Sequence, residues 1–174
     1  GAGTTFHARE EIIVCAGALE SPKLLMLSGL GPAQHLRAHG IEPIIDLPGV
    51  GENLSDHLAA TVYHESCVPL DRTRWTAEAG LFTRTSTCSS RHAPDLQFHV
   101  LSKTSYHIDP AFPENTWIMG PTLLQPKSRG RISLLSNDVR HLPRIETRYL
   151  REQADVDVLV EGIQLAREIA RQPA

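Results

Sequence analysis

Two neighbouring side chains of this 174-residue chain, Asp56 and His57, are of the types that general acid–base chemistry uses, because a carboxylate can orient an imidazole. Adjacent residues of an extended chain point to opposite faces, so we expect these two side chains not to pair with each other. Gln97 and His99 are two residues apart in an alternating segment and therefore share one strand face. From the sequence, we expect this face either to line a substrate cavity or to face solvent. None of these residues makes up a complete active site.

A glycine-rich stretch, Gly49-Val50-Gly51-Glu52-Asn53-Leu54, begins like a dinucleotide-binding fingerprint. It lacks the third glycine, and Pro48 interrupts any strand that would lead into a phosphate-binding loop. We therefore predict a structural turn here. The three cysteines have no spacing typical of a metal site, and Cys15 is predicted to be a small core residue.

Composition indicates an ordinary globular chain, with 41% hydrophobic and 21% charged residues. The net charge of −3, without a Lys/Arg cluster, argues against a nucleic-acid surface. No apolar run approaches the roughly 20 residues that a membrane-spanning helix needs. The sequence gives no indication of a compartment.

The first elements predicted along the chain are a strand and two helices. Ile12 to Cys15 is a short apolar run typical of a buried strand. We expect a helix to follow, with Ser21 at its N-cap, Pro22 at its first position, and an apolar side formed by Leu24, Leu25 and Leu27. Gly29 and Gly31 end it, and a second helix runs from Ala33 to His39.

The rest of the chain predicts strands and one long helix, which gives a mixed α+β fold. Gly120-Pro121 is expected to form a bulge or to lie in an edge strand. A final helix at about 153–171 is expected to pack on the sheet through Val156, Leu159, Val160, Ile163, Ala166 and Ala170. The predicted strands are 43–47, 58–65, 79–84, 96–100 and 117–124, followed by an alternating segment at Ile132 and Leu134.

The segment Gly17-Ala18-Leu19-Glu20-Ser21-Pro22-Lys23-Leu24-Leu25-Met26-Leu27-Ser28-Gly29-Leu30-Gly31 resembles a signature of the glucose–methanol–choline (GMC) oxidoreductases. The similarity continues through 41–57 and, in the order of the family, at 94–99, 126–132 and 143–170. This family consists of FAD-dependent enzymes that oxidise alcohols, including choline dehydrogenase-like members. We therefore expect an internal fragment of such an enzyme.

The resemblance implies two partial domains. Residues 1–57 are expected to be the C-terminal portion of a Rossmann-like FAD-binding domain. Residues 58–174 are expected to be a portion of the substrate-binding domain, an antiparallel sheet flanked by helices, truncated before the catalytic C-terminal segment. Neither the phosphate-binding glycine motif of the family nor its catalytic histidine is present in this sequence, so we expect the isolated chain to be inactive.

Site residues follow from the same resemblance. The end of the first strand is expected to approach FAD closely through its backbone, and the segment that enters the second domain is expected to contact the flavin. The predicted cofactor-binding residues are Ala16, Gly17, Ala18, Asn53, Asp56 and His57. Glu78, in a stretch similar to choline-oxidising members, could attract a cationic substrate, and Gln97 and His99 are the other substrate candidates. No catalytic residue and no metal ligand is assigned.

The implied reaction is hydride transfer from the CH–OH carbon of a small alcohol to the flavin, with oxygen or another electron acceptor reoxidising it. Three alternatives remain open. A hydroxynitrile lyase has the same fold without net redox turnover, and a truncated remnant would be a non-catalytic interaction module. The third is a coincidental match, in which case the chain is a free-standing α+β domain.

Overall fold

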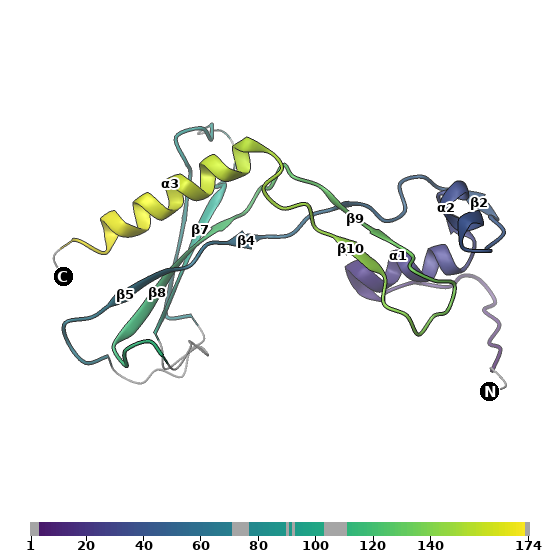
Figure 1. Cartoon of the computed structure of the whole chain (residues 1–174), viewed down its shortest axis with the longest axis horizontal. Coiled ribbons are helices and arrows are strands. Elements are labelled where there is room, and N and C mark those ends of the chain that lie inside the picture. Colours follow the sequence, from purple (N-terminus) through teal and green to yellow (C-terminus); the bar gives the residue numbers. More distant parts are fainter. Residues whose placement is uncertain (1–3, 71–76, 90, 92, 103–110, 173–174) are drawn as a thin grey trace. The chain divides into compact units, whose positions relative to one another are not determined.

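The computed structural model describes residues 4–70, 77–89, 91, 93–102 and 111–172. The chain forms two compact units (Figure 1): Gly1–Leu54 with Gly130–Thr147, and Ser55–Arg129 with Arg148–Ala174. The predicted boundary after residue 57 lies close to the end of the first stretch. Residues 130–147, however, return to the first unit, because their hairpin pairs with a strand of that unit. The roles assigned to the two domains stay predictions.

The first unit is a small α/β assembly around four buried side chains, Met26, Leu36, Ile132 and Leu134. Two strands pair in parallel, and three others form an antiparallel sheet in the order β10–β9–β3. Its elements are α1 (Gly17–Leu27), β1 (Leu30–Gly31), α2 (Ala33–Ala38), β2 (Ile45–Asp46), β3 (Glu52–Leu54), β9 (Gly130–Ser133) and β10 (Arg144–Glu146).

The strand predicted at 12–15 is absent, so this prediction was wrong. Ile12 is 79% exposed, Ile13 is 76% exposed, and Cys15 is exposed rather than part of the core. A strand is stabilised by the ladder it forms with a neighbour, and no described residue pairs with this segment. An apolar composition alone therefore does not make this segment a strand.

Helix α1 begins four residues before the predicted cap, at Gly17. Gly17 has φ +84°, a left-handed conformation that lets the chain turn sharply into the helix. Ser21 lies inside the helix, where its Oγ accepts a hydrogen bond from the Ala16 N–H at 3.0 Å. The buried side is Lys23 and Met26, whereas Leu24, predicted to face the core, is 43% exposed.

The second unit is a five-stranded antiparallel sheet with one helix, α3, packed on a face of it (Figure 1). The strand order is β4–β8–β7–β6, and β5 also pairs with β8. This confirms the predicted antiparallel sheet with a flanking helix. The elements are β4 (Leu58–Ala59), β5 (Val62–Glu65), β6 (Ala79–Thr83), β7 (Leu96–Ser102), β8 (Thr116–Leu123) and α3 (Gln153–Ile169).

Pro121 lies in β8, which has neighbours on both sides, so the predicted bulge or edge was wrong. The Pro121 carbonyl accepts the Ala60 N–H at 2.9 Å. In an antiparallel ladder the N and O of one residue face the same neighbour, so the missing proline N–H faces the break between β4 and β5. The neighbouring strand is interrupted where the donor is missing, and β8 itself continues.

Helix α3 presents a different face to the sheet from the one predicted. Leu159 and Ala166 are buried as expected, but Val160 is 48% exposed. Gly162 is buried in its place, with Pro121 and Leu96 against it. The helix is rotated because a position without a side chain lets its backbone approach the central strands closely.

A buried carboxylate, Asp155, fixes the start of α3. Its side chain is 1% exposed and accepts the backbone N–H groups of Lys127 at 2.7 Å and Ser128 at 2.8 Å. Burial alone would raise the pKa of Asp155, but the hydrogen bond with the Ser128 side chain, these two backbone hydrogen bonds and the charge of Arg129 outweigh it, so the pKa lies below its ordinary value. Ser128 Oγ in turn accepts the N–H groups of Arg151 and Glu152. The loop before β9 and the helix start are thus joined.

Candidate functional site

The predicted cofactor residues of the first unit lie at the N-terminus of α1 and in β3. At Gly17 a Cβ atom would have no heavy atom of the described residues within 4 Å, apart from its chain neighbours and the backbone of its own helix, so the space beside this backbone is open. The N-cap residue of α1, Ala16, has no side-chain hydrogen bond to the first turn, which leaves amide groups of that turn available to an anionic ligand. Asn53 has φ +61°, a conformation that Asn adopts more readily than most residues. The local geometry of Ala16, Gly17 and Ala18 fits close backbone approach by a nucleotide.

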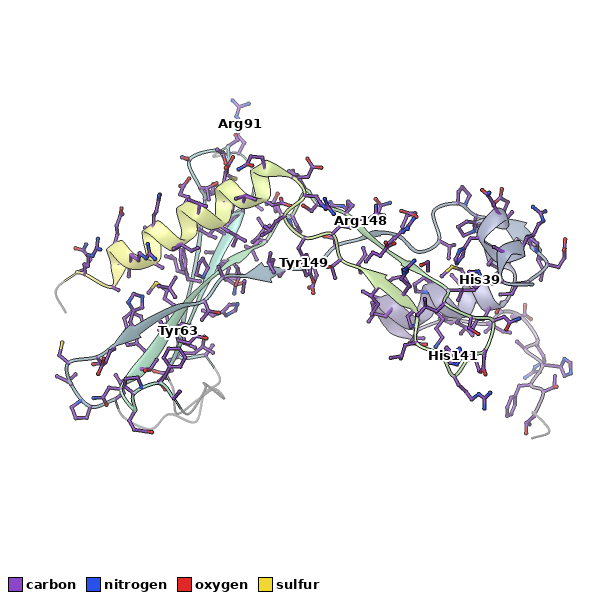
Figure 2. All side chains as sticks on the ribbon, viewed as in Figure 1. His39, Tyr63, Arg91, His141, Arg148 and Tyr149 are labelled. Atoms are coloured by element: carbon purple, nitrogen blue, oxygen red, sulfur yellow. The ribbon has the colours of Figure 1, made fainter. Side chains whose placement is uncertain are left out.

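Asp56 and His57 belong to the second unit and are exposed. One carboxylate oxygen of Asp56 accepts the backbone N–H of His57 at 2.8 Å, and the other accepts the Tyr149 hydroxyl at 3.2 Å. Burial, and then the charge of Asp56, raise the pKa of Tyr149. Figure 2 shows Tyr149 beside Arg148, in a stretch where Arg148 and Leu150 have positive φ. The Asp56 carboxylate therefore orders this loop.

Gln97 and His99 lie on the face of the sheet that α3 does not cover. Leu96 and Phe98 alternate with them along β7 and are each 1% exposed in the core beneath α3. Gln97 and His99 are half-buried. The shared face predicted from the alternation is thus present, and a binding role for it stays a prediction.

An aromatic pair lies on the same face and has no counterpart in the sequence predictions. Tyr63 of β5 pairs with Ile118 of β8, which in turn pairs with Leu101 of β7, so Tyr63 and His99 share this face. The Tyr63 ring, labelled in Figure 2, stacks on Phe112 with centroids 4.5 Å apart and an interplanar angle of 7°. Alternation in 62–65 could have indicated the face of Tyr63, but its neighbours come from strand register.

Glu78 precedes the edge strand β6. One oxygen of its carboxylate accepts the Ser102 N–H at 3.1 Å, which joins the start of β6 to the end of β7. The Glu78 side chain thus has a structural contact, and a substrate role for it stays a prediction.

On the opposite face, beneath α3, His64 stacks on Trp117 with ring centroids 4.4 Å apart. Its Nε2 is buried and has no hydrogen-bond partner among the described residues. Burial, and then the positive charge of Arg167, lower the pKa of His64. This ring is packed as a neutral group.

Two cavities lined by described residues contain none of the predicted site residues. One, of about 400 Å³, lies in the first unit between α2, the 50–52 turn and the β9–β10 hairpin. The other, of about 220 Å³, lies in the second unit beside the start of α3. Among the described residues, no helix has the length and apolarity needed to cross a membrane.

Two family models, both described as GMC oxidoreductase, match the chain. The N-terminal one matches residues 1–59 and the C-terminal one matches residues 126–174. Choline oxidase of Arthrobacter globiformis is 44% identical over 176 residues, which is 96% of this chain and 32% of that protein. An oxygen-dependent choline dehydrogenase of Pseudomonas aeruginosa (strain UCBPP-PA14) is 36% identical over 195 residues, with coverages of 98% and 34%.

Solved structures agree with these matches. Pyridoxine 4-oxidase from Mesorbium loti superposes with a TM-score of 0.79 and 27% identity, over 91% of this chain and 32% of that one. Formate oxidase of Aspergillus oryzae RIB40 gives a TM-score of 0.81 at 23% identity, over 92% and 37% of the two chains, which shows the fold. The chain spans about a third of the length of the curated relatives it matches. It belongs to the GMC oxidoreductase family.

Proposed function

We propose that the gene product containing these residues is an FAD-dependent oxidoreductase that oxidises the CH–OH group of a small alcohol of the choline type. The observation that carries the proposal is the 44% identity to a choline oxidase over 96% of the chain, across both units. A single shared motif would give similarity over a short stretch, and not over nearly the whole chain.

Each unit has a part in this proposal. FAD, when bound, accepts the hydride from the carbinol carbon and passes the electrons to oxygen or another acceptor. The uncapped start of α1, with open space beside Gly17, offers backbone N–H groups to the cofactor. Asn53, Asp56 and His57 are proposed to contact the cofactor from the loop that follows β3.

The uncovered sheet face is proposed to hold the alcohol. Gln97 and His99 are polar groups on an otherwise packed sheet, suited to hydrogen-bond a hydroxyl. The stacked rings of Tyr63 and Phe112 offer a π face to a quaternary ammonium group, an interaction of about 0.5–2 kcal/mol. The Glu78 carboxylate adds negative charge at the edge of the same sheet.

The test is to mix the FAD-loaded gene product with choline under anaerobic conditions and to record the flavin absorbance over time. Bleaching is expected. A His99→Ala variant should bleach at least about tenfold more slowly, as expected from the loss of one substrate hydrogen bond. A matched His141→Ala variant, which removes an exposed histidine of the first unit, should leave the rate unchanged.

A charge-specific readout tests the aromatic pair. Tyr63→Leu should reduce the preference for choline over its uncharged isostere 3,3-dimethylbutan-1-ol several-fold. If flavin is bound but no primary alcohol bleaches it, the oxidoreductase proposal is wrong. Cleavage of a cyanohydrin without bleaching would instead assign the protein to the lyases of this fold.

A further inference from the structure

In the first unit, a histidine side chain takes the place of a backbone acceptor at the edge of a strand. The Ile132 N–H of β9 donates to the Gly51 carbonyl at 2.6 Å. Two residues further, no described strand pairs with this edge of β9, because the segment that leads into β3 turns away from it. There the Leu134 N–H donates to Nε2 of His35, at 3.0 Å. His35 of α2 thereby joins that helix to the β9–β10 hairpin, 99 residues away in sequence.

This hydrogen bond fixes the protonation state of the ring. Nε2 accepts a hydrogen bond from the Leu134 amide, so it carries no hydrogen of its own, and the neutral imidazole has its hydrogen on Nδ1. The position of the Leu134 amide is fixed because Leu134 is only 4% exposed and packs in the core of the unit. Protonation of Nε2 would place one N–H group against another at this contact, with no acceptor for the Leu134 amide.

The groups around the His35 ring disfavour its positively charged form. Burial, then His39, then Arg131 lower the pKa of His35. The His39 ring, at the end of α2 (Figure 2), has its centroid 4.4 Å from that of His35, and its Nδ1–H donates to the His35 carbonyl. Arg144 of β10 and Glu52 of β3 line the same cavity, where Glu52 is the acidic member.

We propose that His35 is a pH-sensitive latch that holds α2 on the β9–β10 hairpin when neutral and releases it when protonated. The cavity of about 400 Å³ lies between these elements, with His35, His39 and Leu134 in its wall. Loss of the latch opens this cavity to solvent. The β9–β10 hairpin, on one side of the contact, remains folded by the pairing of β9 with β3 and β10.

Amide hydrogen exchange of the full chain tests the latch, with an internal reference. The Leu134 amide depends on His35, whereas the Ile132 amide of the same strand edge depends on a backbone carbonyl. After correction for intrinsic exchange, the protection of Leu134 relative to Ile132 should fall at least about tenfold between pH 7.5 and pH 5, the effect of leaving one buried donor unpaired.

His35→Gln places a carbonyl at a similar reach without a titrating group, so the protection ratio should become independent of pH. The matched variant His39→Gln keeps the latch and should retain the pH dependence, with its midpoint moved to higher pH. A ratio that is constant with pH in the wild type, or that still varies in His35→Gln, would overturn the proposal.

A second measurement uses the wild-type chain alone, in case His35→Gln does not fold. Nitrogen NMR of the His35 ring gives its tautomer and its titration midpoint. The Leu134 amide shift should change with the same midpoint as Nε2 of His35. Different midpoints, or a hydrogen on Nε2 at neutral pH, would contradict the latch.

Discussion

Replacing Gly162 of α3 with alanine sets helix propensity against packing. Alanine is favoured over glycine in a helix interior by about 1 kcal/mol, so propensity alone predicts a more stable protein. The new Cβ, however, would lie 2.8 Å from Pro121 Cβ and 3.0 Å from Leu96 Cδ1. Carbon atoms are best placed roughly 3.5–4.0 Å apart, so α3 or the sheet must move.

The packing cost is expected to be larger than the propensity gain. Pro121 is a rigid ring on the central strand, and Leu96 is 1% exposed, so neither has free space to enter. Overpacking of this kind costs about 1–3 kcal/mol. After the propensity gain is subtracted, we expect a net loss of about 1 kcal/mol in the free energy of unfolding.

Urea unfolding followed by Trp117 fluorescence measures this, since Trp117 of β8 belongs to the same sheet. The midpoint should fall with an unchanged slope. Gln164→Ala, at an exposed position of the same helix, is the matched control and should stay within about 0.5 kcal/mol of the wild type. A rise of the midpoint for Gly162→Ala would refute the close approach of α3 to the sheet.

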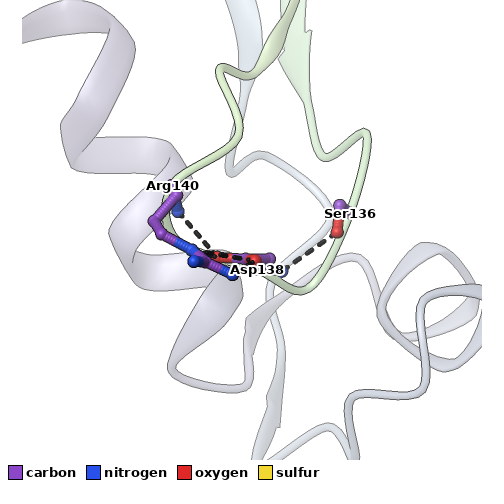
Figure 3. Close-up of polar contacts among 3 residues, drawn as sticks. All are labelled: Ser136, Asp138 and Arg140. Atoms are coloured by element: carbon purple, nitrogen blue, oxygen red, sulfur yellow. Dashed lines mark hydrogen bonds and ion pairs between the residues drawn. The ribbon is translucent and has the colours of Figure 1, made fainter. Parts of the chain in front are cut away.

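Three further predictions concern titratable groups. Asp155→Asn should lower the free energy of unfolding by about 2–3 kcal/mol. One charge-assisted hydrogen bond from a backbone N–H is lost, and the new NH₂ group faces that donor. An unchanged urea midpoint would contradict this prediction. Burial lowers the pKa of His64 below its unfolded value, so the unfolded chain binds more protons in acid. Stability should therefore fall as pH drops below about 6.5, less steeply in His64→Phe, and parallel thermal-melting profiles of the two proteins would argue against it. Asp138 accepts Arg140 Nε at 3.0 Å and its own N–H donates to Ser136 Oγ (Figure 3). The Arg140 contacts lower the pKa of Asp138 to about 2, so Arg140→Ala should return the carbon NMR titration of that carboxyl towards its ordinary range.

Patterns that depend on near neighbours in the chain predicted local structure well. The second helix was expected at 33–39 and is observed at Ala33–Ala38, since its start at Pro32 and its end at Gly40 are local effects. The period-2 alternation of 96–100 predicted which side chains of β7 share a face. The candidate residues Gln97 and His99 were found in this way.

Sequence reasoning was wrong where a residue's state depends on a partner far along the chain. The apolar run at 12–15 forms no strand, because no other described segment pairs with it. The place of Pro121 in a central strand depends on a break in another strand, between β4 and β5. The aromatic pair on the sheet face that carries Gln97 and His99 exists because the residues just before β8 bring Phe112 onto Tyr63.

The sequence by itself determined the family, the α+β class and the local alternation of buried and exposed positions, because these are recorded in residue types and short spacings. Only the tertiary structure decided that residues 130–147 return to the first unit, that α3 approaches the sheet at Gly162, and that His35 accepts the Leu134 amide. Each of these depends on strand register and close packing between distant segments, which short sequence patterns do not encode.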